Sequence, residues 1–220
     1  MKIARLPRLL CLVAAAAFAA QPAPGSLTWG GHTWTHGPSA YGNASAFHVA
    51  DDTLVAAETA TGEGGILWLV GEHPAFTLTV KVRAEQPADG GIYVCADARE
   101  RGYQVRVDHW QSHGNIGGIY CDGVPGGIIA GTGCFAEPWR PDAWNDLKIT
   151  VSRLPIPAGE AAASATRIEV WVNGTQVTIF DTPSTPGARV GLQLHSNIQH
   201  DHHTPGKKIF FKDFSLVKTD

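Results

Sequence analysis

The sequence predicts an all-β protein with the architecture of a two-sheet antiparallel jelly-roll sandwich. Apolar and polar residues alternate in many short segments, which is the pattern of strands that bury one face. The chain has 25 glycines and 14 prolines, and turns rich in these residues separate the segments. No amphipathic helix is recognisable after residue 20. Because most segments have one polar face, two packed sheets are favoured over a barrel.

The first half of the chain contains several clear strand patterns. A continuous apolar run at residues 65–70 predicts a buried strand, and residues 76–83 alternate between apolar and polar side chains. A turn at residues 89–91 then leads into another apolar segment. In residues 103–108, the two valines are expected to face the core, so the side chains on the opposite face are Gln104, Arg106 and Asp108.

The stretch 168–195 predicts three further strands joined by two turns. Asn173-Gly174 is a strong hairpin signal, because both residues tolerate positive φ angles. A second break follows at residues 182–187, where proline, serine and glycine gather. The apolar residues of these strands are expected in the core, and the outward side chains include Glu169, Trp171, Gln193 and His195. A final strand is expected over residues 209–217.

The beginning of the chain predicts export. Residues 1–20 combine basic residues, an apolar run and small residues before a cleavage point, which indicates a signal peptide. Residues 21–28 are interpreted as a linker, and residues 29–220 as one sandwich domain. No later run is long and apolar enough to cross a bilayer. The expected location is therefore the periplasm or the extracellular medium.

Charge and aromatic content narrow the class of partner. The net charge is -3 and the basic residues are scattered, so no nucleic-acid-binding stripe is visible. The chain has seven tryptophans, and aromatic residues beside polar ones suit carbohydrate stacking. Packing in the core or at its rim is the alternative role for any single tryptophan.

Three cysteines remain after the expected cleavage. Cys121 and Cys134 flank a glycine-rich loop, and in an oxidising compartment they are the better pair for a disulfide. Cys95 lies in a strand pattern and is expected to be a buried free thiol. Their spacing does not match a zinc site.

A histidine-rich loop occupies residues 197–207. His200, His202 and His203 are candidate ligands for a divalent cation, since imidazole binds zinc, copper and nickel. A solvated loop, or contacts with sugar, are the alternatives for this segment. No other cofactor is indicated.

The order of these motifs resembles the 3-keto-disaccharide hydrolase family, bacterial secreted domains of concanavalin-like or laminin-G-like jelly-roll fold. The resemblance extends over roughly residues 29–218. It rests on GGILW, FTLTVKVRAE, GGIYV, GYQVRVD, AWNDLKITV, IEVWVNGTQV, GLQLH and IFFKDFSLV in this order. The family usually has a glutamate and a glutamine where this chain has Gln104 and Arg106.

The resemblance implies cleavage of glycosides whose sugar is oxidised to a ketone at carbon 3. Such a reaction needs a base, an acid and a positive group for an enolate oxygen. Asp108 and His195 are the candidate acid and base, and Arg106 is the candidate partner of the ketone oxygen. The remaining candidates bind the sugar: Gln104, Glu169 and Gln193 through hydroxyl groups, and Trp171 or Tyr103 by stacking.

We further expect a single concave site. The argument is that Arg106, Asp108, Trp171, Gln193 and His195 all point away from the apolar residues of their strands. Two other interpretations remain: a surface ion pair between Arg106 and Asp108, and a two-carboxylate site using Asp108 and Glu169. A carbohydrate-binding or surface-interaction module without catalysis is the alternative to an enzyme, because one fold supports all of these functions.

The first testable prediction concerns export. The basic start, apolar run and small residues predict cleavage near Ala20. N-terminal sequencing of protein recovered from the periplasm or medium is expected to begin close to Gln21. Exported protein that still begins at Met1 would contradict this interpretation.

Overall fold

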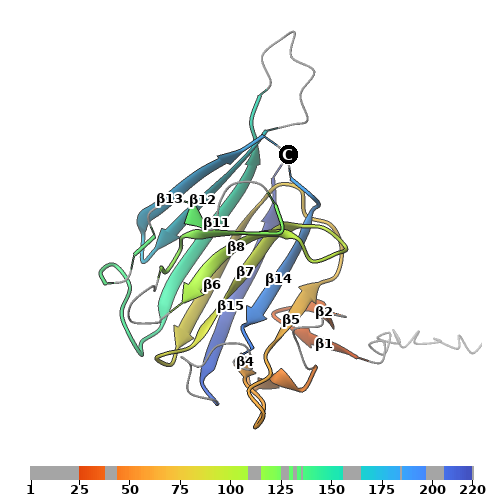
Figure 1. Ribbon diagram of the computed structural model, residues 1–220, viewed down its shortest axis with the longest axis vertical. Coiled ribbons are helices and arrows are strands. Elements are labelled where there is room, and N and C mark those ends of the chain that lie inside the picture. Colours follow the sequence, from red (N-terminus) through yellow and green to blue (C-terminus); the bar gives the residue numbers. More distant parts are fainter. Residues whose placement is uncertain are drawn as a thin grey trace, which may run out of the picture.

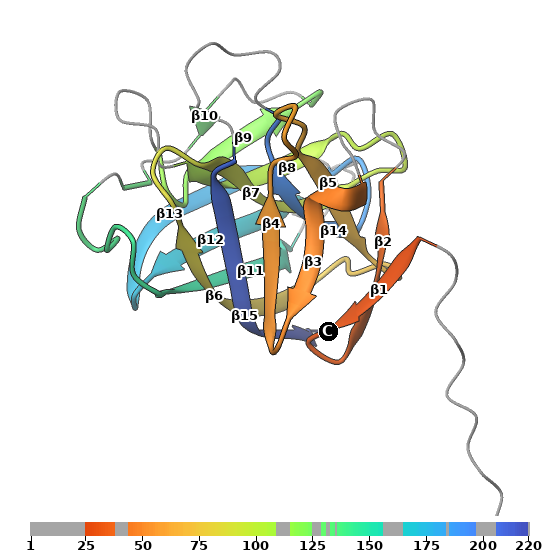
Figure 2. The same ribbon diagram turned by 90° about the horizontal axis from the view of Figure 1, so that it is seen from below.

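A computed structural model describes residues 25–37, 44–108, 115–124, 129–130, 133–134, 136–155, 165–183, 185–196 and 206–219. In these residues the chain forms two antiparallel sheets that lie against each other as the layers of a sandwich (Figures 1 and 2). One short 3₁₀ segment, η1 (Ala44–Ala46), is the sole helical element of this part of the chain. The predicted all-β sandwich is therefore confirmed.

The first sheet, called sheet I, has eight strands in the described residues. In spatial order they are β1 (Ser26–Trp29), β2 (His32–His36), β5 (Gly65–Leu69), β14 (Arg189–Leu194), β7 (Asp89–Ala96), β8 (Gly102–Asp108), β9 (Ile119–Asp122) and β10 (Ile129–Ala130).

The second sheet, sheet II, has seven strands in the same part of the chain. Their order is β13 (Thr175–Thr182), β12 (Thr166–Val172), β11 (Asn145–Arg153), β6 (Phe76–Ala84), β15 (Lys208–Lys218), β4 (Thr53–Ala57) and β3 (Phe47–Ala50). In the middle of each sheet the neighbours are far apart in sequence, as β14 and β7 are in sheet I and β6 and β15 are in sheet II, so long-range pairing joins distant parts of the chain within each sheet.

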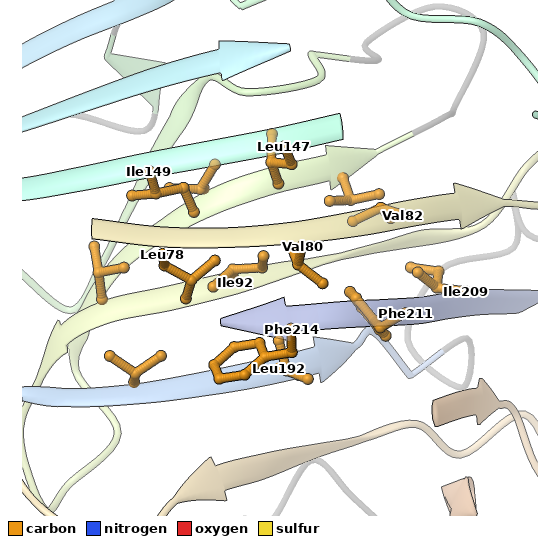
Figure 3. Packing of buried hydrophobic residues seen from close by; sticks show 14 of the residues in the cluster. Leu78, Val80, Val82, Ile92, Leu147, Ile149, Leu192, Ile209, Phe211 and Phe214 are labelled. Carbon is orange, nitrogen blue, oxygen red and sulfur yellow. The ribbon is translucent and has the colours of Figure 1, made fainter. Parts of the chain in front are cut away.

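The inner faces of the two sheets form one apolar core. Leu78, Val80 and Val82 of β6 are at most 3% exposed, and they meet Ile92 and Leu192 from sheet I (Figure 3). Each such side chain contributes about 1.5–3 kcal/mol when it is fully buried. The valines and leucines predicted to be buried, which are Val105, Val107, Val170, Val172, Leu192 and Leu194, all lie in this core.

The predicted Asn-Gly hairpin joins β12 to β13. Asn173 and Gly174 have φ angles of 49° and 82°, the left-handed values that a tight hairpin turn requires. Val172 then pairs with Thr175 across the turn. This part of the prediction is confirmed.

The stretch 168–195 does not stay within one sheet. β13 is an edge strand of sheet II and β12 lies next to it, whereas β14 lies between β5 and β7 in sheet I. The alternation of side chains fixes which face of a strand is apolar, but it does not state to which sheet the strand belongs. This crossing decides which of the predicted site residues can meet.

The start of the domain also differs from the prediction. β1 begins at Ser26 and pairs with β2 from Ser26↔Thr35 onwards, so residues 26–28 belong to the sandwich and not to a linker. The proposed signal peptide lies outside the described residues. No helix in the described part of the chain has the length and apolar character needed to cross a membrane.

A buried asparagine fastens the corner before β11. The side chain of Asn145 accepts hydrogen bonds from the Arg140 amide (2.8 Å) and from Asn173 Nδ2 (2.8 Å). Its own amide donates to the carbonyl oxygens of Arg140 (2.9 Å) and Ala143 (2.8 Å). Asn145 is fully buried, so these four bonds replace all the contacts with water that it gives up.

The second prediction is that Asn145→Ala lowers the free energy of unfolding by about 2–4 kcal/mol, because several buried polar groups lose their partners. Denaturant unfolding followed by tryptophan fluorescence measures the change. Asp146→Asn is the matched control, since it alters only an exposed pair with Lys81 and should cost less than about 1 kcal/mol. Equal effects of the two variants would contradict the role given to Asn145.

Candidate functional site

Five polar residues predicted from the sequence gather on the outer face of sheet I. β7 lies between β8 and β14, and its Gly91 pairs with both Arg106 and Gln193. The side chains of the two flanking strands therefore lie on either side of a position that has no side chain. We call this set the β8–β14 cluster; it comprises Gln104, Arg106, Asp108, Gln193 and His195.

Gly91 forms the floor beneath a bond that joins the two flanking strands. Gln104 Nε2 donates a hydrogen bond to Gln193 Oε1 across β7. A Cβ atom at position 91 would lie 2.7 Å from Gln104 Cγ and 2.6 Å from the Val105 carbonyl oxygen, closer than such atoms approach. Glycine is therefore required where the glutamine side chain crosses the strand. Both glutamines are more than nine-tenths buried.

Arg106 and Asp108 form an ion pair within β8. They are two residues apart on the same face of the strand, and an Arg106 Nη2 proton points to Asp108 Oδ2. The Asp108 side chain is 1% exposed and that of Arg106 is 13% exposed. The pair is thus not the exposed and weak surface pair considered as one alternative. A largely buried guanidinium that bonds to a carboxylate keeps a defined orientation, because its planar fork of donors fits the carboxylate oxygens.

His195 follows directly after β14 at the same end of the sheet. Its backbone amide donates to the Asp89 carbonyl oxygen (2.9 Å), and Asp89 in turn pairs with Asp108 in the strand register. His195 Nδ1 lies 2.9 Å from the Ser196 carbonyl oxygen. Because a carbonyl oxygen only accepts hydrogen bonds, Nδ1 must carry the proton. In the neutral ring the basic lone pair is then on Nε2.

The other end of the same face is closed by aromatic residues that the sequence interpretation missed. Trp68 is 1% exposed, donates through Nε1 to Glu100 (2.9 Å) and lies beneath the guanidinium of Arg189 (4.3 Å from the ring centre). Tyr93 stands beside it and donates to Asp122 Oδ2 (2.7 Å). Burial and the nearby Asp122 carboxylate raise the pKa of Tyr93 well above its usual range.

A signal for these residues was present in the strand patterns. Tyr93 lies two residues after Gly91 on β7, and Trp68 pairs with Gly191 on β14. Both positions therefore share the face of Gln193 and Arg106. Both residues lie in apolar runs of the sequence, where a tryptophan or tyrosine is interpreted as part of the core.

Two predicted sugar-binding residues lie elsewhere. Trp171 and Glu169 belong to β12 of sheet II, on the opposite side of the sandwich from the β8–β14 cluster. Glu169 accepts hydrogen bonds from Thr150 (3.2 Å) and Gln176 (2.9 Å) on that outer face. The prediction of one site containing Trp171 with Arg106, Asp108, Gln193 and His195 is therefore wrong, as is the pairing of Glu169 with Asp108.

The prediction that Tyr103 stacks on a sugar is also wrong. It has the same parity as Val105, so it points between the sheets and is 1% exposed. Its hydroxyl lies 2.6 Å from Thr182 Oγ1 of sheet II, and its ring packs against Phe180. A side chain in this position links the two layers and does not stack on a ligand.

The predicted disulfide is not present. Cys121 and Cys134 are both free thiols, Cys121 on the inner face of β9 and Cys134 opposite Ile116 in an isolated bridge. Both side chains belong to the apolar core, Cys121 as a buried member and Cys134 as a partly buried residue packed against it. The prediction for Cys95 is confirmed, since it is free and 2% exposed, and burial raises its pKa to about 12.

The histidine-rich loop with His200, His202 and His203 lies outside the described residues. Among the residues that are described, no three His, Cys, Asp or Glu side chains are grouped as a metal site would require.

The sequence profile of the 3-keto-alpha-glucoside-1,2-lyase-like domain matches residues 26–217, which is most of the chain. The protein belongs to this family. The match begins at the first residue of β1 and ends within β15, so it includes both sheets and the whole β8–β14 cluster. Membership assigns the chain to a group of carbohydrate-active proteins.

Solved structures share the fold of this family member at low sequence identity. A putative glycosyl hydrolase from Parabacteroides distasonis has a TM-score of 0.54 and 15% identity, over 84% of this chain and 99% of that one. The β-glucanase of Bacillus licheniformis has a TM-score of 0.56 and 9% identity, over 85% and 92%. The carbohydrate-binding module CBM66 of Bacillus subtilis has a TM-score of 0.51 and 13% identity, over 84% and 95%. No protein with a curated description matches the sequence.

The third prediction tests the floor of the cluster. Gly91→Ala should lower the free energy of unfolding by roughly 1–3 kcal/mol, the usual cost of forcing atoms into a packed position. Part of this cost comes from the Gln104 side chain and part from the Val105 carbonyl oxygen.

The double variant Gly91→Ala/Gln104→Ala separates these contributions. Its loss of stability should be smaller than the sum of the two single losses, as expected for residues in contact. Strict additivity in denaturant unfolding would show that Gln104 does not lie over Gly91.

Proposed function

We propose that this protein cleaves glycosides whose sugar carries a ketone at carbon 3, and that the β8–β14 cluster performs the reaction. The observation that carries the proposal is the gathering of a guanidinium–carboxylate pair and two bridged amides on the strands that flank Gly91, with His195 directly after one of these strands and bonded to Asp89 through its backbone amide. Family membership supports the choice of reaction, since the family is described by cleavage next to a 3-keto group.

The first step is removal of the hydrogen on carbon 2, which the neighbouring ketone makes acidic. His195 Nε2 accepts this proton, because its Nδ1 proton is held by the Ser196 carbonyl oxygen. The electron pair of the broken C–H bond moves onto the ketone and forms an enolate. Arg106 stabilises the negative oxygen, and Asp108 keeps the guanidinium in place.

The second step breaks the bond between carbon 1 and the leaving oxygen. The enolate re-forms the ketone, its electrons make a double bond between carbons 1 and 2, and the leaving oxygen takes the proton from His195. Addition of water at carbon 1 and of a proton at carbon 2 then gives the free 3-keto sugar. Gln104 and Gln193 present amide groups at the same face for the sugar hydroxyls.

A binding role without turnover is the competing function. The carbohydrate-binding module CBM66 has the same fold, and the polar groups of the cluster already pair with one another. A binding module would recognise the unoxidised sugar as well as the ketone.

We also propose that the protein acts after export, in the periplasm or outside the cell, as the beginning of the sequence indicates.

The fourth prediction is turnover of para-nitrophenyl 3-keto-α-glucoside but not of the unoxidised glycoside, measured by release of nitrophenol. Deuterium at carbon 2 should slow the reaction, because the bond to this atom breaks first. His195→Ala should lower the rate at least about 100-fold, the low end for a positioned base. Arg106→Gln should lower it by a similar factor, since an enolate loses its stabilising charge.

Glu169→Gln is the matched control, because Glu169 is a predicted site residue that lies on the other sheet. Its rate should equal that of the unmodified protein. If the protein shows no turnover but binds the unoxidised sugar, it is a binding module and the proposed enzymatic function is wrong. An unchanged rate in His195→Ala would remove His195 as the base.

A further inference from the structure

The outer face of sheet II carries aromatic residues that the proposed reaction does not use. Trp171 on β12, Trp144 immediately before β11, and Phe210 on β15 are all half-buried on this face. Trp144 lies four residues before Lys148, the strand partner of Trp171. The backbone positions of the two tryptophans are thus about 13 Å apart along the strand direction, at ~3.3 Å per residue.

Each of these rings is covered by a cation. Lys148 Nζ lies 4.4 Å from the centre of the Trp171 ring, and Lys212 Nζ lies 4.4 Å from that of Trp144. Arg83 lies 4.1 Å from the centre of the Phe210 ring and 5.6 Å from that of Trp144. Contacts of this kind at exposed sites contribute only about 0.5–1 kcal/mol, so a ligand can displace the cations easily.

The same three cations have no carboxylate partner among the described residues. The ion pairs of this face join Lys81 to Asp146 (2.8 Å) and Asp213 (3.8 Å), and Arg167 to Asp181 (2.7 Å). Nε of Arg83 is buried without a hydrogen-bond acceptor. Positive charge is therefore left unmatched beside the aromatic rings, on a protein whose net charge is -3.

An open depression of about 510 Å³ lies beside Trp171 and Lys148. It lies over β6, β11, β12 and β15, and Lys81, Asp146, Lys148, Trp171 and Asp213 contribute to its wall. A ligand in it meets an indole, an unmatched ammonium and two exposed carboxylates. The carboxylates accept hydrogen bonds from hydroxyl groups, whereas the ammonium needs an anion.

We propose that this face of sheet II binds an acidic oligosaccharide, separately from the β8–β14 cluster. The apolar face of a sugar ring lies on Trp171, with Trp144 as a second platform. The carboxylates of the oligosaccharide pair with Lys148 and Lys212, and its hydroxyls donate to Asp146 and Asp213. The surface holds the protein on an anionic glycan while the other sheet carries out the reaction.

The fifth prediction is measured by titration calorimetry with an oligogalacturonate hexasaccharide. We expect binding that weakens as salt is added, because exposed charges are screened. Neutral maltohexaose should bind at least about tenfold more weakly. Trp171→Ala should lower the affinity roughly tenfold or more, as for a buried aromatic contact in an interface. Lys148→Gln and Lys212→Gln should each lower it about threefold, as for exposed charge pairs.

Two control variants show whether the binding belongs to this surface. Arg167→Gln removes an exposed cation of the same sheet that is already paired with Asp181, so it should leave the affinity unchanged. His195→Ala should also leave it unchanged, which distinguishes failure of this proposal from failure of the proposed reaction. The lysine variants preserve the aromatic rings, so they test the surface even if Trp171→Ala unfolds. Absence of binding, equal binding of maltohexaose, or loss of affinity in either control overturns the proposal.

Discussion

The packing of two sheets through their inner faces is the interaction on which the rest of the structure depends. Strands from all parts of the chain, including β6, β11, β7 and β14, contribute buried aliphatic side chains to the same layer. Every strand then has a second face that the core does not need. The protein has two such outer faces pointing in opposite directions, and their chemistry differs.

The chemistry of the outer face of sheet I depends on the absence of a side chain at Gly91 of β7. β7 has glycine at position 91, so the side chains of β8 and β14 meet across it instead of being held apart. The glutamine bridge and the arginine–aspartate pair are well buried, and buried polar groups with satisfied partners keep one geometry. A site that stabilises a developing charge needs this rigidity, because its dipoles must be in place before the reaction begins.

The outer face of sheet II differs from that of sheet I in its side chains and in their burial. Its tryptophans are only half-buried, and lysine and arginine side chains lie on the rings where a packed domain would place aliphatic residues. Such cations keep the face hydrated, and each exposed contact with a ring is worth only about 0.5–1 kcal/mol. The same sandwich can therefore present a fixed, buried polar set on one side and an exchangeable aromatic and cationic surface on the other.

The sequence by itself determined the fold class, the Asn173–Gly174 hairpin and the face on which each strand places its polar residues, because alternation with a period of two is a local property. It thereby assigned outward positions to Gln104, Arg106, Asp108, Gln193 and His195, which lie on or directly after the two strands next to β7. Only the tertiary structure decided which strands share a sheet. The chain passes from sheet II to sheet I between β13 and β14, and this crossing separates Trp171 and Glu169 from His195 although they are close in sequence. Tyr103 points into the core because it has the parity of Val105, which the alternation already implied, but only the opposite sheet supplies the partners that hold it there, Thr182 and Phe180.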